Sequence, residues 1–166
     1  MGLSFSLDLQ MDQISAAAAG IRELTGNLRP MLEDIGMEGE TSTMERFETN
    51  LAPDGTPWTP SLRATLTGTP TLVDRGHFRD GIHYQVDGDD AVEWGSNAVQ
   101  ARIHQEGGTI VAKGDGLAFT LASGAFALVK SVTIPARPYL GLSDADQVAI
   151  GEIAETHLKL ALGGAA

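Results

Sequence analysis

The feature that most constrains the fold is a pair of alternating segments around a turn rich in aspartate and glycine. Apolar residues occupy every second position on both sides of Asp87-Gly88-Asp89-Asp90, at Ile82, Tyr84, Val86, Val92 and Trp94. A period of two is typical of a strand with one buried face, and aspartate and glycine suit tight turns. The segment therefore predicts an antiparallel β-hairpin.

A second hairpin is predicted farther along the chain. The same alternation flanks residues 122–125, at Leu117, Phe119, Leu121, Phe126 and Leu128. Between the two hairpins, residues 98–105 suit a short helix, which the glycine pair Gly107-Gly108 would end.

The N-terminal third of the chain has the spacing of amphipathic helices. Residues recur there at steps of three and four, at Met11, Ile14, Ala18, Ile21, Thr25 and Leu28. This spacing predicts a helix that Asp8 caps and Gly26-Asn27 ends. Pro30 then suits the first turn of the next helix, and we expect Gly36 and Gly39 to interrupt it.

Two more helices are predicted. One is short, carries Met44, Phe47 and Leu51, and ends before Pro53, because the residue before a proline avoids the helical region. The other is capped by the pair Ser143 and Asp146. Its apolar stripe consists of Ile150, Ile153, Ala154, Leu158, Ala161 and Leu162. His157 falls on this stripe, which predicts a partly buried histidine.

These elements predict one α+β domain over residues 1–166, a length that can bury an ordinary core. Residues 1–51 form its helical N-terminal part, residues 82–140 its β-rich part and residues 143–162 its C-terminal helix. We expect antiparallel hairpins to form a sheet on which the N-terminal and C-terminal helices pack.

Composition excludes several classes of site. Eleven Lys and Arg against 22 Asp and Glu give a net charge of −11, which argues against a surface that grips nucleic acid. The absence of cysteine excludes disulfides, thiolate metal sites and cysteine nucleophiles. Residues 116–129, the longest nearly uncharged stretch, are too few to span a bilayer, and we expect residues 1–10 not to be a secretory signal.

A search for catalytic and ligand-binding motifs predicts no catalytic residue, no cofactor and no metal. The chain has neither a phosphate-binding loop, nor a nucleophile elbow, nor a zinc-binding helix motif. The turn aspartates lack the spacing of a calcium loop, and no spacing places His77, His83 and His104 together as zinc ligands. His104 and Glu106 leave a remote alternative, a small hydrolase, without a nucleophile to complete it.

Three segments rich in proline and glycine have the residues of fixed shapes and are candidates for structural or interface roles. They supply Pro53, Asp54, Gly55 and Trp58, then His104, Gln105, Gly107 and Gly108, and last Pro135, Arg137 and Pro138. Prolines stiffen the first segment, and Trp58 suits an aromatic anchor for it. Residues 134–140 are predicted to run extended at a sheet edge or over the surface, with Arg137 preset for a carboxylate partner.

Taken in order, these motifs resemble a known family over about residues 40–160. The pattern consists of Arg46-Phe47, Pro53-Asp54-Gly55-x-x-Trp58, Leu72-x-x-x-Gly76-x-Phe78-Arg79-x-x-Ile82, Trp94-Gly95-Ser96-Asn97, Ile103-His104-Gln105-x-Gly107-Gly108 and Ile134-Pro135-Ala136-Arg137-Pro138-Tyr139-Leu140-Gly141. The chain resembles the phage virion morphogenesis, or tail completion, family of Mu-like and P2-like tailed bacteriophages. It departs from the family locally at Asp74-Arg75 and at Val99-Gln100-Ala101.

The resemblance implies a structural virion protein of the head–tail junction with a tail-terminator-like α+β fold. The resemblance further implies that such a connector subunit forms a homo-oligomeric ring, expected to be a hexamer. The ring would contact neck and tail tube proteins and be assembled in the host cytoplasm. DNA passes its lumen without specific binding, which an acidic wall would favour by repelling phosphate. The resemblance carries over no catalytic residue. The alternative is a non-structural or minor head morphogenesis factor.

A head-to-tail ring requires two different contact patches on each subunit. The sequence offers the small-residue helix face Ala16–Ala19 and the extended segment Ile134–Leu140, whose predicted edge position would leave backbone groups free to pair. Two interpretations of the helix face stay open: it packs on its own domain, or it contacts a neighbouring subunit.

Overall fold

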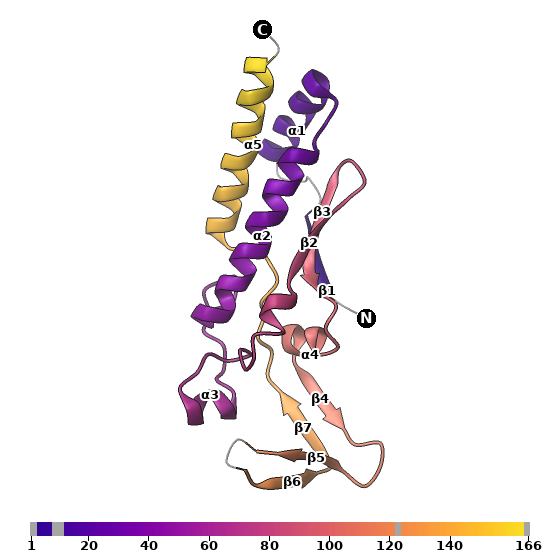
Figure 1. Ribbon diagram of the computed structural model, residues 1–166, viewed down its shortest axis with the longest axis vertical. Helices are drawn as coiled ribbons and strands as arrows, with labels where there is room; N and C mark the ends of the chain where they lie inside the picture. Colours follow the sequence, from indigo (N-terminus) through magenta and orange to yellow (C-terminus); the bar gives the residue numbers. More distant parts are fainter. Residues whose placement is uncertain (1–2, 8–11, 122–123, 165–166) are drawn as a thin grey trace.

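The computed structural model describes residues 3–7, 12–121 and 124–164 and confirms the α+β class. Its elements in chain order are β1 (Leu3–Leu7), α1 (Asp12–Thr25), α2 (Arg29–Thr49), α3 (Leu62–Thr67), the 3-10 turn η1 (Arg79–Gly81), β2 (His83–Asp87), β3 (Ala91–Ser96), α4 (Ala101–Glu106), β4 (Gly108–Val111), β5 (Leu117–Thr120), β6 (Phe126–Val129), β7 (Ser131–Ile134) and α5 (Asp144–Gly164). The molecule is elongated, with α1, α2 and α5 toward one end and β4 to β7 at the other (Figure 1).

The first predicted hairpin is confirmed as the antiparallel pair β2–β3, in register from His83↔Gly95 to Asp87↔Ala91. Strand β1 pairs with the other side of β3, so the order is β1-β3-β2. Val92 and Trp94 alternate on the buried face of β3, which packs against α2.

The expectation that Gly36 and Gly39 interrupt a helix is wrong, because α2 runs unbroken from Arg29 to Thr49. A Cβ atom at Gly39 would lie 2.5 Å from Cε2 of Trp94, and one at Gly36 would collide with Tyr84. The two glycines therefore let the helix backbone approach the sheet closely, which offsets their poor helix propensity. The predicted short helix around Phe47 is the C-terminal part of α2 and not a separate element.

The N-terminal helix packs on its own domain, and a contact of its small residues with a neighbouring subunit stays a prediction. Helix α1 packs along α5, and its predicted seam is buried at Ile14, Ala18 and Ile21. It ends at Gly26 as predicted, whereas the predicted cap Asp8 lies outside the described residues. Ala17 is buried but Ala16 and Ala19 are exposed, so part of the small-residue face stays open to solvent.

The C-terminal helix is confirmed as α5 with the predicted cap pair. The Asp146 backbone N–H donates to Ser143 Oγ at 3.1 Å, and the Ser143 backbone N–H donates to Asp146 Oδ2 at 2.7 Å. His157 is half-buried as predicted, with Nε2 2.7 Å from Asp34 Oδ2. Within the described ranges, no helix combines the length and the apolar character needed to cross a membrane.

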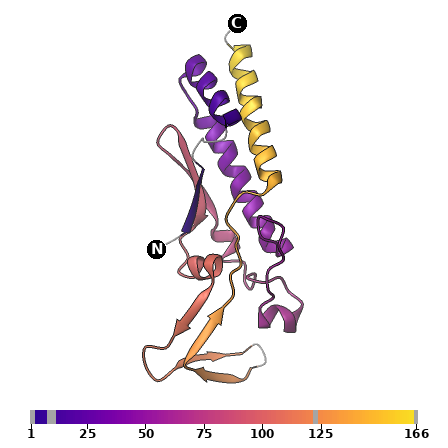
Figure 2. The same cartoon turned by 180° about the vertical axis from the view of Figure 1, so that it is seen from behind.

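The second predicted hairpin is confirmed as β5–β6, but it does not join the first hairpin in one sheet. In the described residues, β4 pairs with β7 and β5 with β6 as separate two-stranded ribbons. No described residue between 108 and 134 is buried, so the apolar side chains of these strands do not pack on the helices. We call residues 108–134 the β arm; Figure 2 shows it from behind, extending away from the helices.

Candidate assembly site

The proline- and glycine-rich motifs converge where the β arm meets the helical body. Residues 135–141, which we call the strap, connect β7 to the start of α5 and pass along the end of α2 (Figure 1). Trp58 is only 4% exposed, and its Nε1 donates to the Pro138 carbonyl at 2.9 Å. The tryptophan therefore fixes the loop of residues 53–60 onto the strap.

An aromatic cluster fills the space beneath the strap. Phe47 of α2 lies nearly perpendicular to Trp58 and to Phe78, with ring centroids 5.6 and 5.3 Å apart, an arrangement that aromatic pairs favour. Tyr139 of the strap completes the cluster, 5.2 Å from Phe78. Its ring is fully buried, and burial raises the pKa of Tyr139 to about 12.

Gln105 holds the strap through main-chain hydrogen bonds. Its Oε1 accepts from the N–H groups of Tyr139 and Leu140 at 2.9 and 3.0 Å, and its Nε2 donates to the Leu140 carbonyl at 3.0 Å. The Arg137 N–H donates to the His104 carbonyl at 2.7 Å. The expectation that residues 134–140 offer a free edge is therefore wrong, because their backbone groups are bonded within the same chain.

Among the residues that the structure describes, Arg137 does not have the predicted carboxylate partner. Its Nε donates to the Thr59 carbonyl at 2.8 Å, and burial lowers the pKa of its guanidinium. Arg137, between the two prolines of the strap, therefore links the strap to the loop of residues 53–60 through this hydrogen bond.

The sequence patterns did not reveal the buried ion pair between Arg46 and Asp146. Arg46 also donates to the carbonyls of Tyr139 and Gly141 at 2.8 and 3.0 Å. Burial lowers the pKa of the Arg46 guanidinium, an effect that the carboxylate of Asp146 opposes. Arg46 belongs to the family motif and Asp146 to the cap pair, but no sequence pattern indicates that these two residues pair.

The remaining marked residues make turns around this junction. Asp54 Oδ1 accepts from the Thr56 N–H at 2.9 Å, which closes the predicted turn and lowers the pKa of the Asp54 carboxyl. Pro53 faces Gly141 of the strap. Gly107 has φ +71°, and a Cβ atom there would lie 2.7 Å from the Ala136 nitrogen. Gly107, followed by Gly108, therefore lets the two chain segments of the arm pass each other closely.

The structure does not bring His104 and Glu106 together as an acid–base pair. His104 packs on Phe78 with ring centroids 5.8 Å apart, and burial, with the charge of Arg137, lowers the pKa of its imidazole. Glu106 is exposed and bonded to Arg102 Nε at 2.9 Å. In the part of the chain that the structure describes, no three His, Cys, Asp or Glu side chains gather as metal ligands would.

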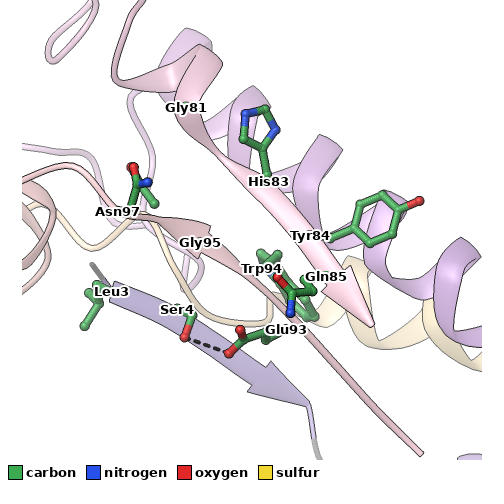
Figure 3. Close-up of a pocket in the computed structure, with 11 residues that line it drawn as sticks. Leu3, Ser4, Gly81, His83, Tyr84, Gln85, Glu93, Trp94, Gly95 and Asn97 are labelled. Atoms are coloured by element: carbon green, nitrogen blue, oxygen red, sulfur yellow. Dashed lines mark hydrogen bonds between the residues drawn. The ribbon is translucent and has the colours of Figure 1, made fainter. Parts of the chain in front are cut away.

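A shallow hollow of about 390 Å³ lies on the face of the sheet turned away from α2 (Figure 3). His83, Gln85 and Glu93 line it, and Ser4 Oγ donates to Glu93 Oε2 at 3.1 Å. The lining combines polar and apolar groups and is open to solvent.

Among the described residues, the exposed phenylalanines lie on the β arm, and Phe126 is the more exposed of the two. Phe126 is 71% exposed and Leu128, two positions on, is 57% exposed. Val111 and Ile110 of β4 are exposed as well. Several exposed apolar side chains on one projecting segment indicate a contact surface for another molecule.

Comparison with known proteins agrees with an assembly role. The model of the phage virion morphogenesis family matches residues 9–159, which include the helical body, the junction and the arm. No curated protein and no solved structure matches the chain. The family match covers most of the sequence and contains every motif that converges on the junction, so the chain belongs to the phage virion morphogenesis family.

Proposed function

We propose that this chain is a structural subunit of the phage head–tail junction, where copies of it form a ring that completes the tail. Membership of the family gives it a phage virion-related role. The observation that carries the finer proposal is the β arm, an apolar projection that contributes nothing to the chain's own core. A projection of this kind serves a subunit that must contact its neighbours.

Charge supports a place around the DNA path. The chain has a net charge of −11. Exposed acidic residues include Glu45 and Glu48 of α2. An acidic ring wall repels phosphate, so DNA passes without being held. The neighbours of such a ring are neck and tail tube proteins, and the count of six subunits rests on the family resemblance.

The test is deletion of the gene from its phage, with complementation by the wild-type chain. We expect the deletion to leave DNA-filled heads and separate tails that lack the ring and do not join. A reconstruction of the complemented virion neck should show ring density that fits the elongated subunit. Virions that join normally without the chain would overturn the proposal.

Mass spectrometry of purified virions separates this role from that of an assembly factor that leaves the particle. A ring subunit is present at several copies per virion. Malformed heads in the deletion, together with virions that lack the chain, would favour the assembly factor.

A further inference from the structure

The β arm differs in charge from the rest of the molecule. Residues 108–134 contain Lys113, Lys130 and Asp115, a formal charge of +1, which leaves −12 on the remainder of a chain whose net charge is −11. The arm is therefore a weakly cationic, apolar projection on a strongly acidic body. Its charge is complementary to that of a second copy of the same body.

The apolar residues of β6 form a defined contact face. Residues two apart on a strand point to the same side, so Phe126 and Leu128 share a face. Their partners across the ribbon on that face are the small residues Thr120 and Ala118. The two large side chains consequently stand above small neighbours and are free to insert into a recess.

A matching recess lies between α1 and α5. This groove has a volume of about 780 Å³, and its lining includes Ala16, Ala17, Val148, Gly151 and Leu158. Val148 on its wall is 63% exposed. Glu152 and Glu155 also line the groove, and α5 as a whole has four acids against one lysine. The groove is thus apolar within an acidic helix pair.

The arm cannot reach the groove of its own chain. Both views show β5 and β6 at the end of the elongated molecule that is remote from the α1–α5 pair (Figures 1 and 2). The strap that joins the arm to α5 is fixed by Gln105, Arg46 and Trp58. An arm that fills this groove must therefore come from another copy.

We propose that the arm of one copy docks through Phe126 and Leu128 into the α1–α5 groove of the next copy. This inference rests on the proposed ring function and names its subunit contact. Two different patches meet, so the contact is head-to-tail and closes into a ring when its rotation closes. One of the two contact patches is thus the small-residue helix face that the sequence indicated. The other is the β arm, in place of residues 134–140.

Because the chain contains no cysteine, introduced cysteines are its only thiols that can react with a maleimide. The phage deleted for the gene is complemented with the double variant Phe126→Cys/Val148→Cys, and purified virions are treated with a short bis-maleimide. Denaturing gels should show dimers, trimers and larger products up to the full ring. Each single-cysteine variant should show none of these products.

The matched control is Phe126→Cys/Val99→Cys, because Val99 is 93% exposed and lies outside the groove. We expect no ladder from it. All replaced side chains are exposed, and the melting temperature of each purified variant verifies folding. Dimers from Phe126→Cys alone would show arm-to-arm pairing, and a ladder from the control alone would place the arm elsewhere; both overturn the groove contact.

Failure of the contact and failure of the function give different results. Joined virions that contain the chain but yield no 126–148 products overturn the arm-in-groove contact and leave the ring function standing. Virions that join without the chain overturn both.

Discussion

At the scale of single residues, side chains of the junction donate mainly to main-chain carbonyls. Trp58, Arg137 and Arg46 donate to the carbonyls of Pro138, Thr59 and Tyr139 respectively. Each bond crosses between segments far apart in the sequence, so each fixes the path of the chain. Removing one donor leaves a carbonyl without its partner as well as a packing defect.

Replacement of Trp58 by alanine should therefore destabilise the subunit strongly. The ring is almost fully buried and packs on Phe47, so Trp58→Ala should lower the free energy of unfolding by about 3–5 kcal/mol. Urea denaturation measures this. Trp58→Phe, which keeps much of the ring and loses the Nε1 hydrogen bond, should cost less. An unchanged midpoint for Trp58→Ala would mean that the loop of residues 53–60 contributes nothing to stability.

Asp146 should give stability an acid dependence. Burial alone would raise the pKa of its carboxyl, but hydrogen bonds from Ser42 and Ser143 and the charge of Arg46 outweigh this, so the pKa is lowered. A lowered pKa means that stabilisation is present above the ordinary value of about 3.9 and is lost as the pH falls through the folded-state value.

The variant Asp146→Asn should therefore lose about 3–5 kcal/mol of unfolding free energy at pH 7, because it leaves Arg46 buried without its counter-charge. The difference from the wild type should narrow below about pH 4. Urea denaturation at a series of pH values measures both effects. Asp144→Asn, an exposed control on the same helix turn, should change stability by less than about 1 kcal/mol. Parallel pH profiles for wild type and Asp146→Asn would contradict the account.

At the scale of elements, sequence patterns correctly predicted the helices and hairpins that are determined by residues close together in the chain. The hairpin β2–β3 and the cap pair of α5 depend on residues within a few positions of each other, and both are confirmed. Helix α2 was predicted as broken, because Gly36 and Gly39 disfavour helix when only neighbours in sequence are considered. Trp94 and Tyr84, which require those glycines, are far away in the sequence.

Substitution of Gly39 tests this account of α2. Alanine favours helix over glycine by about 1 kcal/mol, yet its Cβ would overlap Trp94. Gly39→Ala should therefore destabilise the subunit by about 1–3 kcal/mol, measured by thermal and urea denaturation. Gly151→Ala in α5 is the matched control, because nothing lies within 4 Å of its Cβ position, and it should stabilise slightly. Stabilisation by Gly39→Ala would contradict close helix–sheet packing.

At the scale of the whole molecule, the parts most relevant to assembly were the least predictable. The marked motifs do meet at one junction, but the ion pair that secures it joins residues separated by 100 positions. The arm was predicted as strands and not as a projection, since alternation in β5 and β6 does not reveal whether their apolar face is covered. The ion pair and the position of the arm both depend on tertiary contacts, which a single sequence does not show.

The separation of arm and body leads to a prediction about truncation. Residues 110–132 can be replaced by Asn-Gly, which joins Thr109 to Thr133 of the β4–β7 ribbon through a two-residue hairpin turn. No described residue of the arm is buried, so the melting temperature should change by less than about 3 °C. Complementation of the deleted phage should nevertheless yield unjoined heads and tails. A large loss of thermal stability would show that the arm supports the body's core.

The junction also determines an angle. Arm and body meet where Gly107 passes Ala136, and bonds from Gln105 and Arg137 fix the chain on both sides of this crossing. The inclination of the arm is therefore built into the free subunit before any neighbour arrives. In a circle of identical copies, one repeated inclination sets the turn per copy, and with it the number of members and the width of the bore. A small change at the crossing would then alter the symmetry of the circle, even where each subunit stays equally stable.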